Sequence, residues 1–319
     1  MSRCAVIGLG NAGFLYDYPL SNNTYSHAKA YFELKNTELI AASEIDQKKI
    51  EIFQSVYNVP VYNSYLDMME HEKIDIVSIC SPNATHTKIL QDLIKYNIKC
   101  VFCEKPISNS LDYLEDIFNQ YNEKKIPIYV NYFRRWDKKI TNIKDNFFNS
   151  EKDVLKFIIV KYSKGLIHNG THYLDLFMKW FNNPIRFENI KFIENNDETD
   201  LTLSFDIFFK HNNKPIKVSM NGCTEENYSD EIIFHTNNNI IKILNTREIY
   251  FYDNKKKFIK TELTNFNNII VEVIDSIIRE ISELSYENLN INAKSSYDCL
   301  LLANNIISNF DNIKKNNEN

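Results

Sequence analysis

Apolar positions follow two different rhythms along the chain, and the change between them divides the sequence into two parts. Through about residue 130, short apolar runs alternate with amphipathic runs of helical period. This alternation is typical of a parallel sheet with helices on both faces. The expected strands are RCAVI, ELIAAS, DIVSIC, KCVFCE and PIYVNYF, and the expected helices are SHAKAYFEL, DQKKIEIFQSVY, THTKILQDLIKY and LDYLEDIFNQYN. We therefore predict a doubly wound α/β domain over residues 1–128.

From about Asp153 the rhythm changes to extended segments, several of which alternate apolar and polar residues. Such alternation predicts a mostly antiparallel sheet with one covered face. The expected strands are VLKFIIVKYS, RFENIKFIE, DLTLSFDIFFK, PIKVSMNG, EIIFHT, NIIKIL and EIYFYD, and helical patterns return in HYLDLFMKWF, IIVEVIDSIIREI and SSYDCLLLANNIISNF. Residues 129–319 are thus expected to form an α+β domain whose sheet is open on one face, and an exposed apolar face is a candidate oligomer interface.

Charge and composition narrow the classes of partner. The 319 residues carry a formal net charge of -5, with Lys and Arg dispersed among Asp and Glu. A basic stripe of the kind that binds nucleic acid is therefore not expected, and no apolar run approaches the roughly 18 residues of a membrane span. We expect a soluble, cytoplasmic protein. Its scattered cysteines are expected to be buried free thiols; they are Cys4, Cys80, Cys100, Cys103, Cys223 and Cys299.

The most informative motif is GLGNAG, which holds three of only six glycines in the chain, Gly8, Gly10 and Gly13. It follows a predicted strand, and a helix is expected to open after it. In a dinucleotide-binding βα turn, Gly8 would allow the tight turn, Gly10 the approach of a pyrophosphate, and Gly13 close helix–strand packing. Asn11 and Ala12 complete this candidate cofactor loop. The alternative is a tight turn without a ligand.

Acidic residues follow the second predicted strand. Glu44 closes ELIAASE, and Asp46 lies two residues later. A carboxylate there can accept hydrogen bonds from an adenosine ribose and would repel a 2'-phosphate, which predicts NAD in preference to NADP. For Asp46 the alternative is that it caps the helix DQKKIEIF.

Two further strand ends carry polar residues. SPNATH follows DIVSIC, and EKP follows KCVFCE. His86 is expected to start or orient the next helix rather than to catalyse, whereas Lys105 lies between a carboxylate that can position it and Pro106, which can fix the turn through a cis bond. These segments add to the candidate cofactor site Ser81, Pro82, Asn83, His86, Glu104 and Lys105.

The segment HNGTHYLD gathers His168, Asn169, His172 and Asp175. Acid–base or substrate contact, a structural histidine pair and a metal site are the alternatives. Gly170 between the histidines and the absence of a clear third ligand argue against a metal. We expect acid–base or substrate contact, and no metal.

Together, GLGNAG, SPNATH, EKP and the G-x-H-x-x-D pattern of GTHYLD resemble, in order and spacing, the Gfo/Idh/MocA oxidoreductases, named for glucose-fructose oxidoreductase and inositol dehydrogenase. The likeness extends to SSYDCLLLANNIIS, which looks like that family's returning C-terminal helix. It implies a Rossmann domain, a mostly antiparallel substrate domain, an active site between them, and homodimers or homotetramers formed through the open sheet.

The resemblance also implies roles for particular residues. Lys105 would be the EKP lysine near the nicotinamide and the reacting hydroxyl, and His172 would transfer the proton. Many dehydrogenases of the family carry Asp four residues before that histidine, where this chain has His168. A histidine can exchange a proton but cannot serve as a fixed carboxylate.

Our hypothesis is reversible oxidation of a secondary hydroxyl on a sugar or nucleotide-activated sugar, with a loose link to bacterial surface-sugar pathways. Catalysis would involve Lys105, His172 and His168. Besides Lys105 and His172, the candidate substrate contacts are Asn131, Arg135, Tyr162, Asn169 and Asp175; for most of these, ordinary packing is the alternative. The rival hypothesis is a nicotinamide-binding sensor or regulatory protein without turnover.

Overall fold

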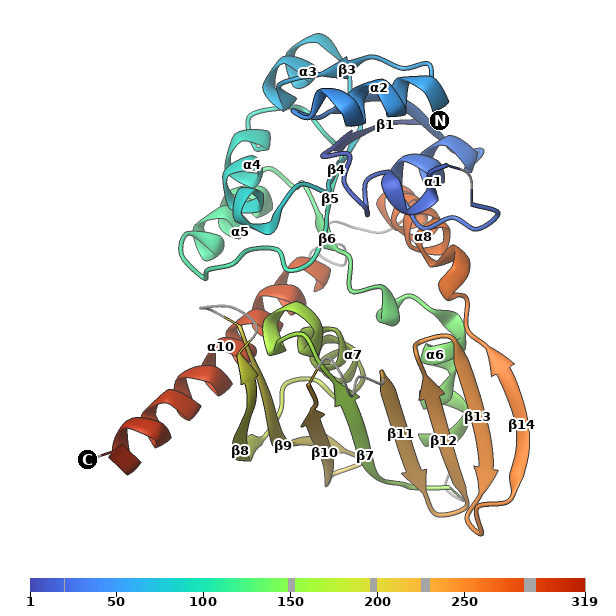
Figure 1. The fold of residues 1–319 in the computed structure, drawn as a ribbon, viewed down its shortest axis with the longest axis vertical. Helices are drawn as coiled ribbons and strands as arrows, with labels where there is room; N and C mark the ends of the chain where they lie inside the picture. Colours follow the sequence, from blue (N-terminus) through green and yellow to red (C-terminus); the bar gives the residue numbers. More distant parts are fainter. Residues whose placement is uncertain (20, 149–152, 196–199, 225–229, 284–290, 319) are drawn as a thin grey trace. The chain divides into compact units, whose positions relative to one another are not determined.

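The chain divides into two units, and each is built from two separate stretches of sequence. Unit 1 contains Met1–Phe133 and Asn267–Tyr297, and unit 2 contains Arg134–Phe266 and Asp298–Asn319. The computed structural model describes residues 1–319 except for 20, 149–152, 196–199, 225–229, 284–290 and 319 (Figure 1). The predicted boundary after residue 128 lies near the division at Phe133, and Asn267–Tyr297 forms a second part of unit 1.

The core of unit 1 is a six-stranded sheet in the order β3-β2-β1-β4-β5-β6, with every neighbouring pair parallel. The neighbouring strands β4 and β5 are fully buried, as expected for short apolar strands covered on both faces. The bounds of the strands are β1 (Ser2–Ile7), β2 (Thr37–Ser43), β3 (Val61–Tyr62), β4 (Ile76–Ile79), β5 (Cys100–Cys103) and β6 (Ile128–Val130).

Helices cover both faces of this sheet. In Figure 1, α1 and α8 lie on one side of it and α4 and α5 on the other. The helices of unit 1 are α1 (His27–Glu33), α2 (Gln47–Val56), α3 (Tyr65–His71), α4 (His86–Leu93), α5 (Leu114–Glu123) and α8 (Ile269–Glu283). The sequence pattern did not predict β3 and α3, which are short; Ser64 caps α3 by accepting from the amide of Asp67.

Helix α8 joins unit 1 although the whole second sheet precedes it in the chain. Ile270, Val273, Ile274 and Ile277 recur at helical spacing and are buried. Polar contacts fix its position, since Asn36 Nδ2 lies 3.3 Å from an oxygen of Asp275 and the amide of Thr24 donates to Asn268 Oδ1 over 3.0 Å.

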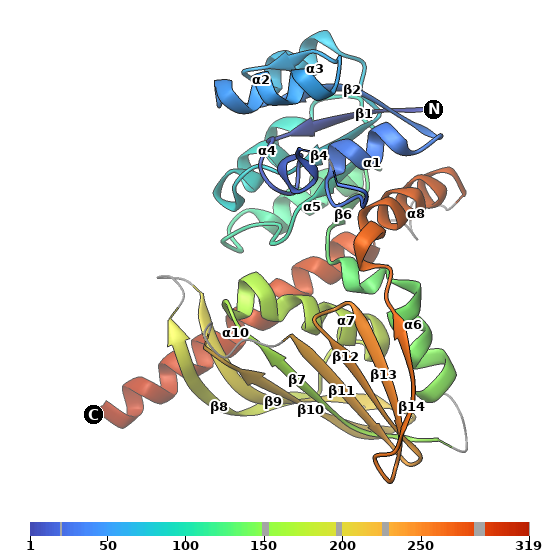
Figure 2. The same ribbon diagram turned by 45° about the vertical axis from the view of Figure 1, so that its right-hand side comes forward.

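Unit 2 contains an eight-stranded sheet in the order β14-β13-β12-β11-β7-β10-β9-β8 (Figure 2). Its pairs are antiparallel except for β7 with β10. The strands are β7 (Leu155–Tyr162), β8 (Arg186–Asn195), β9 (Leu201–His211), β10 (Lys214–Gly222), β11 (Glu231–Thr236), β12 (Asn239–Leu244), β13 (Glu248–Asp253) and β14 (Phe258–Leu263). The helices of this unit are α6 (Lys138–Ile143), α7 (Thr171–Phe181) and, from Asp298 onwards, α10 (Ile291–Glu318).

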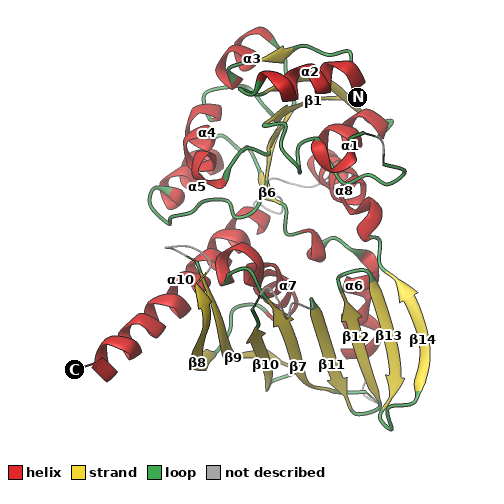
Figure 3. Cartoon of the chain, in the orientation of Figure 1, coloured by secondary structure: helices red, strands yellow, loops and turns green. Residues whose placement is uncertain are grey.

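One face of this sheet packs against helices (Figure 3). The other face carries both aromatic and charged side chains. On the covered face, the ring of Trp180 in α7 lies 5.6 Å from that of Phe234 in β11. On the other face, Phe157 stacks on His235 at 4.3 Å, and Lys161 pairs with Glu231 at 3.0 Å. The predicted fold class, a Rossmann α/β domain followed by a mostly antiparallel open-faced α+β domain, is confirmed.

Candidate functional site

The glycine loop follows β1 at the carboxyl end of the unit 1 sheet, and its three glycines serve different purposes. Gly8 has φ +91°, and a Cβ there would lie 2.7 Å from the amide nitrogen of Ser81. A Cβ on Gly13 would lie 2.0 Å from the carbonyl oxygen of Gly8. A Cβ on Gly10 would meet nothing within 4 Å. Gly8 and Gly13 are therefore required by the fold of the loop, whereas Gly10 faces open space that a ligand could fill.

The segment after the loop differs from the expected helix. It forms turns and a short 3-10 helix at Leu15–Asp17, and α1 begins only at His27. Asp17 holds together the two ends of the segment between Asp17 and Ser26. Its carboxylate accepts from the amides of Tyr25 and Ser26 and from the Ser26 hydroxyl. The chain then returns to the glycine loop, where the amide of His27 donates to the carbonyl of Ala12. A dinucleotide diphosphate would therefore meet loop backbone rather than the first turn of a long helix.

Glu44 is tied to the glycine loop. Its Oε2 accepts from the amide of Leu9 at 2.8 Å, and its Oε1 accepts from the amides of Ile45 and Asp46 at 2.8 and 3.1 Å. A carboxylate has about four acceptor positions, so capacity for a further donor remains. Asp46 instead caps α2 through the amide of Lys48, which confirms the capping alternative for that residue.

The loop after β4 is joined to the EKP turn by His86. Its Nδ1 lies 2.9 Å from the carbonyl oxygen of Pro106, and its Nε2 lies 2.9 Å from that of Ser81. Burial lowers the pKa of His86, and the two carbonyl contacts oppose that shift. His86 is fully buried and orients the two loops, whereas Pro82 is exposed and Asn83 half-buried at the same strand end.

The EKP turn brings Glu104 and Lys105 to the carboxyl end of β5, and the Lys105–Pro106 bond is cis. Glu104 accepts from Asn131 Nδ2 at 2.6 Å and from the amide of Lys105 at 3.3 Å. Its third partner is His27, whose Nε2 lies 3.0 Å from Glu104 Oε1. Sequence reasoning missed His27, and its only signal was a histidine on the apolar face of SHAKAYFEL.

In unit 2, residues Leu166–Gly170 form one turn of π-helix. Asp200, which lies far along the chain, caps this turn. Asp200 accepts from the amides of Ile167 and His168, each at 2.8 Å. A Cβ on Gly165 would lie 2.0 Å from an oxygen of Asp200, and φ there is +84°, so only glycine fits. His168 is exposed, and Asn169 is half-buried with its amide donating to the carbonyl of Ser163.

His172 and Asp175 lie one turn apart on α7, and both are buried. Asp175 pairs with Arg135, whose Nη2 lies 2.9 Å from Asp175 Oδ1. Burial raises the pKa of Asp175 to about 6, although the charges of Arg135 and Lys179 oppose the shift. Arg135 and Asp175 thus hold each other beside His172, an ion pair that the sequence did not reveal.

A second buried cluster surrounds Tyr173 and was also missed. Arg134 Nη2 lies 2.6 Å from Asp230 Oδ2 and 2.8 Å from Thr246 Oγ1, and the Tyr173 hydroxyl donates to Asp230. The Arg134 guanidinium also covers the Tyr173 ring at 4.5 Å. This cluster anchors α7 in unit 2 one residue from His172.

Tyr162, a candidate substrate contact with ordinary packing as the alternative, lies in the interior of unit 2. The residue is fully buried, and its hydroxyl donates to the carbonyl of Leu203 over 2.6 Å. It also packs against Gly170, where a Cβ would lie 3.0 Å from a Tyr162 ring carbon. These contacts agree with the packing alternative for Tyr162.

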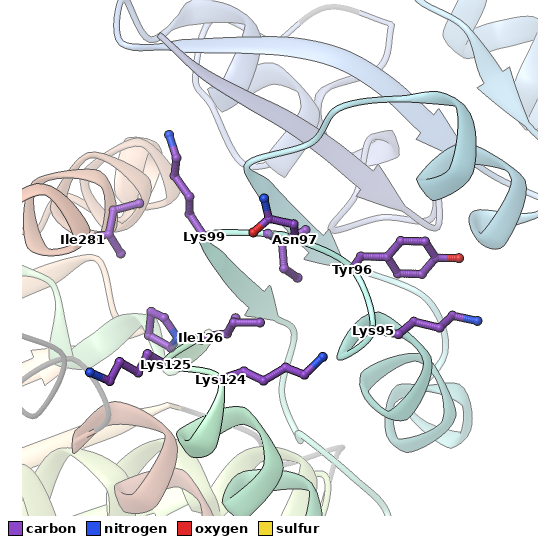
Figure 4. Close-up of a pocket in the computed structure, with 10 residues that line it drawn as sticks. Lys95, Tyr96, Asn97, Lys99, Lys124, Lys125, Ile126 and Ile281 are labelled. Atoms are coloured by element: carbon purple, nitrogen blue, oxygen red, sulfur yellow. The ribbon is translucent and has the colours of Figure 1, made fainter.

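A hollow of about 550 Å³ in unit 1 lies away from these residues. Figure 4 shows it beside Lys99, which precedes β5, and Ile126, which precedes β6, so it is at the amino ends of these strands. Its lysines point in different directions, and Lys99 and Lys124 are held by Asp75 and by the carbonyl of Ile94. The hollow is therefore not part of the candidate cofactor site.

The sequence-based expectations also concerned metal ligands, membrane-spanning helices and cysteines. Within these residues no group of three or more His, Cys, Asp or Glu side chains could hold a metal ion. Across the same part of the chain, no helix is both long and apolar enough to cross a membrane. The six cysteines are free thiols and five are buried; Cys223 is half-buried, which corrects the expectation that all are buried.

Comparison with known proteins relates these features to enzymes. Residues 2–132 match the GFO_IDH_MocA model, described as an oxidoreductase family with an NAD-binding Rossmann fold. The chain is similar to the oxidoreductase YrbE of Bacillus subtilis, with 29% identity over 144 residues, which is 44% of this chain and 39% of that protein. It is also similar to a myo-inositol 2-dehydrogenase of Thermotoga maritima, with 24% identity over 45% of this chain and 40% of that protein. The chain thus matches about two fifths of the length of these relatives.

A likeness in fold extends over both units. A 3-ketoreductase from Actinomadura kijaniata, solved with TDP-benzene and NADP, matches with a TM-score of 0.74 at 11% identity, covering 96% of this chain and 97% of that one. At this identity the likeness concerns the fold alone. It covers a chain with one parallel sheet followed in sequence by a second, larger sheet.

Proposed function

We propose that this chain, a member of the Gfo/Idh/MocA oxidoreductase family through residues 2–132, is a nicotinamide-dependent dehydrogenase. It would move a hydride between the cofactor and a secondary hydroxyl or keto group of a sugar or nucleotide-activated sugar. The observation that carries the proposal is the placement of Gly10, facing open space, and Lys105 at the carboxyl ends of β1 and β5. Ligands of doubly wound sheets bind at this edge.

The residues of unit 1 fit a dinucleotide. The loop from Gly8 to Gly13, with Asn11 and Ala12, would hold the diphosphate, because Gly10 leaves room for it to approach the backbone. Ser81, Pro82 and Asn83 would line the neighbouring strand end, with His86 supporting them from inside. The nicotinamide, when bound, supplies the hydride donor or acceptor; the protein's side chains supply binding, orientation and proton transfer.

Glu44 supports NAD over NADP as the cofactor. Its carboxylate is fixed by three backbone amides and retains capacity for a ribose hydroxyl. A 2'-phosphate in the same place would meet a fixed negative charge. None of the five residues after Glu44 is an arginine that could receive a phosphate, and Lys49 Nζ lies 3.9 Å from a carboxylate oxygen of Glu44.

Lys105 and His172 would carry the chemistry. As hydride leaves the substrate carbon, the hydroxyl must lose a proton; His172 would accept it and Lys105 would stabilise the growing negative charge on oxygen. Asp175, one turn from His172 and paired with Arg135, would fix α7 rather than bind substrate. Asn131, held by Glu104, and Asn169 would contact sugar hydroxyls.

His168 distinguishes this chain from many dehydrogenases of the family. The residue is exposed, and its backbone amide donates to Asp200. An imidazole there can share the proton with His172 but adds no fixed negative charge. We propose that His168 assists proton exchange with solvent.

The substrate class is supported by the relatives. One of them is a myo-inositol 2-dehydrogenase, and a protein of the same fold is a 3-ketoreductase solved with a TDP-linked compound. Both names point to ring carbons that bear hydroxyl or keto groups. A place in bacterial surface-polysaccharide metabolism would suit a nucleotide-activated sugar.

The open face of the unit 2 sheet would form a homodimer or homotetramer. Phe157 is 38% exposed there and stacks on His235, beside the Lys161–Glu231 pair. Sedimentation of the wild type and of Phe157→Asp tests this. A wild-type monomer, or a variant with unchanged mass, contradicts the proposed interface.

The rival candidate is a nicotinamide-binding sensor, and the observation that favours it is His168 in place of the usual aspartate. The experiment that separates the two begins with mass spectrometry of nicotinamide that copurifies with the protein. Absorbance of reduced nicotinamide is then followed with inositols, sugars and UDP-, GDP- or TDP-sugars. Turnover that is lost in His172→Ala supports the dehydrogenase. Tight NAD binding without hydride transfer to or from any panel member favours the sensor.

A further inference from the structure

A continuous chain of buried polar side chains leads from the core of unit 1 to the turn that bears Lys105. The Tyr31 hydroxyl lies 2.6 Å from Ser78 Oγ, and Ser78 Oγ lies 2.8 Å from His27 Nδ1. On the other side of the ring, His27 Nε2 lies 3.0 Å from Glu104 Oε1. We call these four residues the His27 relay. It joins α1, β4 and the residue that follows β5. Tyr31 and Ser78 are 47 residues apart in the sequence, and His27 and Glu104 are 77 residues apart.

The relay is enclosed at one end and reaches the site at the other. Tyr31, Ser78 and His27 are each 0% exposed, whereas the Glu104 side chain is 16% exposed. Phe102 covers the imidazole of His27 with its ring centroid 4.5 Å away, which limits rotation of the ring. A buried polar group without partners is destabilising, so a chain of side chains that pair with one another specifies one arrangement.

Hydrogen-bond chemistry gives the relay a direction. Burial acts to raise the pKa of Glu104, but the hydrogen bond and charge of His27, the hydrogen bond from Asn131 and the charge of Lys105 together lower it. Glu104 is therefore ionised and can only accept, so His27 Nε2 must donate to it. The other ring nitrogen, Nδ1, lies within hydrogen-bond distance of the Ser78 hydroxyl, which also pairs with the Tyr31 hydroxyl.

The relay does not lead protons to solvent. It ends at Tyr31, which is fully buried, and burial raises the pKa of this phenol well above its usual value. A proton that entered at Glu104 would have no exit. The arrangement therefore serves to hold Glu104 in place.

We propose that His27 is a positioning residue for Lys105, acting through Glu104. By donating to Oε1, His27 fixes the carboxylate whose other oxygen accepts from the Lys105 amide and which also holds Asn131. The inference rests on the proposed function, because the role of Lys105 in hydride transfer belongs to that proposal. It adds a residue of α1 that touches neither substrate nor cofactor.

Two substitutions separate positioning from general loss of structure. The amide nitrogen of glutamine in His27→Gln reaches about as far as Nε2 and can still donate to Glu104, while His27→Asn reaches only the Nδ1 position beside Ser78. Both remove the imidazole and its contact with Phe102. We expect His27→Gln to keep kcat within about threefold of wild type, and His27→Asn to lose roughly 10–100-fold in kcat with little change in KM. His71→Asn, at an exposed histidine of α3, is the matched control.

A second readout needs no turnover. Trace acetylation of the apo protein, followed by peptide mass spectrometry, measures the reactivity of the Lys105 amine against Lys99 as internal reference. Displacement of the Glu104 carboxylate favours the neutral form of the Lys105 amine. Lys105 should therefore be acetylated at least about twofold faster in His27→Asn, and at the wild-type rate in His27→Gln. Thermal unfolding of both variants verifies that they are folded.

The outcomes distinguish the two proposals. If no panel substrate reacts but acetylation separates His27→Asn from His27→Gln, the positioning role stands and the proposed reaction falls. If wild type turns over but the two variants behave alike in kcat and in acetylation, His27 is only a structural residue and this inference is overturned.

Discussion

Arg135 and Asp175 form an ion pair with 2.9 Å between Nη2 and Oδ1, and their side chains are 6% and 0% exposed. The pair joins the segment that follows β6 to helix α7, beside His172. Because burial outweighs the guanidinium charge, the pKa of Asp175 is raised to about 6 rather than lowered. This balance differs from that of a surface ion pair, and it makes stability depend on pH in an unusual direction.

The raised pKa of Asp175 predicts that its contribution to stability falls as pH rises. The folded state binds more protons than the unfolded state between about pH 4 and pH 6, so this contribution is fully present below about pH 4 and is lost through pH 6. Urea unfolding at a series of pH values should therefore show the stability of wild type falling relative to Asp175→Asn by about 1–3 kcal/mol across this window.

Asp206 serves as a control because its pKa is shifted in the opposite direction to that of Asp175. Although burial acts to raise its pKa, hydrogen bonds from Asn189, Lys217 and Ser219 lower it overall. Its contribution is present above the unfolded pKa and lost on acidification, so wild type should gain stability relative to Asp206→Asn as pH rises. The same sign for both aspartates would contradict our account of Asp175.

The glycine loop predicts that two similar substitutions have different effects. Gly13→Ala places a Cβ 2.0 Å from the carbonyl oxygen of Gly8 and should destabilise unit 1 by about 1–3 kcal/mol. Gly10→Ala meets nothing within 4 Å and should change stability by less than about 0.5 kcal/mol. It should nevertheless weaken NAD binding at least about tenfold, because the methyl group occupies the space the diphosphate needs. Urea unfolding and calorimetric titration with NAD measure the two effects, and unchanged NAD affinity in Gly10→Ala would remove this loop from the cofactor site.

Cofactor preference should depend on the charge of Glu44. Glu44→Gln keeps an oxygen that can accept from Leu9 but removes the negative charge. The ratio of the NADP to the NAD dissociation constant should fall by about tenfold. Asp46→Asn is the matched control, because the Asp46 side chain caps α2 and asparagine can cap it too. An equal shift in both variants would show that Glu44 does not select the cofactor.

Substitution of Lys105 should separate binding from turnover. Lys105→Ala should leave the NAD dissociation constant nearly unchanged while lowering kcat by about 10²–10³-fold, since it removes the charge that stabilises the developing oxyanion. Lys99→Ala, whose lysine pairs with Asp75 at the amino end of β5, should leave kcat unchanged. Unchanged turnover in Lys105→Ala would exclude this residue from the mechanism.

The sequence by itself determined the elements whose signals are local. Alternation of short apolar runs with amphipathic runs predicted the parallel sheet, and the glycine spacing predicted a loop in which Gly8 and Gly13 have no space for a Cβ. It also placed Lys105 at a strand end and anticipated the capping role of Asp46. These features depend on residues within a few positions of one another, which pattern and turn chemistry describe well.

Only the tertiary structure decided which polar groups meet. His27 reaches Glu104 across 77 residues, Arg135 reaches Asp175 across 40, and Tyr162 donates to Leu203 across 41. No periodicity encodes such pairs, because a buried polar side chain is satisfied by whichever partner the packing of distant elements brings within reach. For the same reason, α8 returns to unit 1 after a whole intervening sheet, since its apolar face finds its cover there.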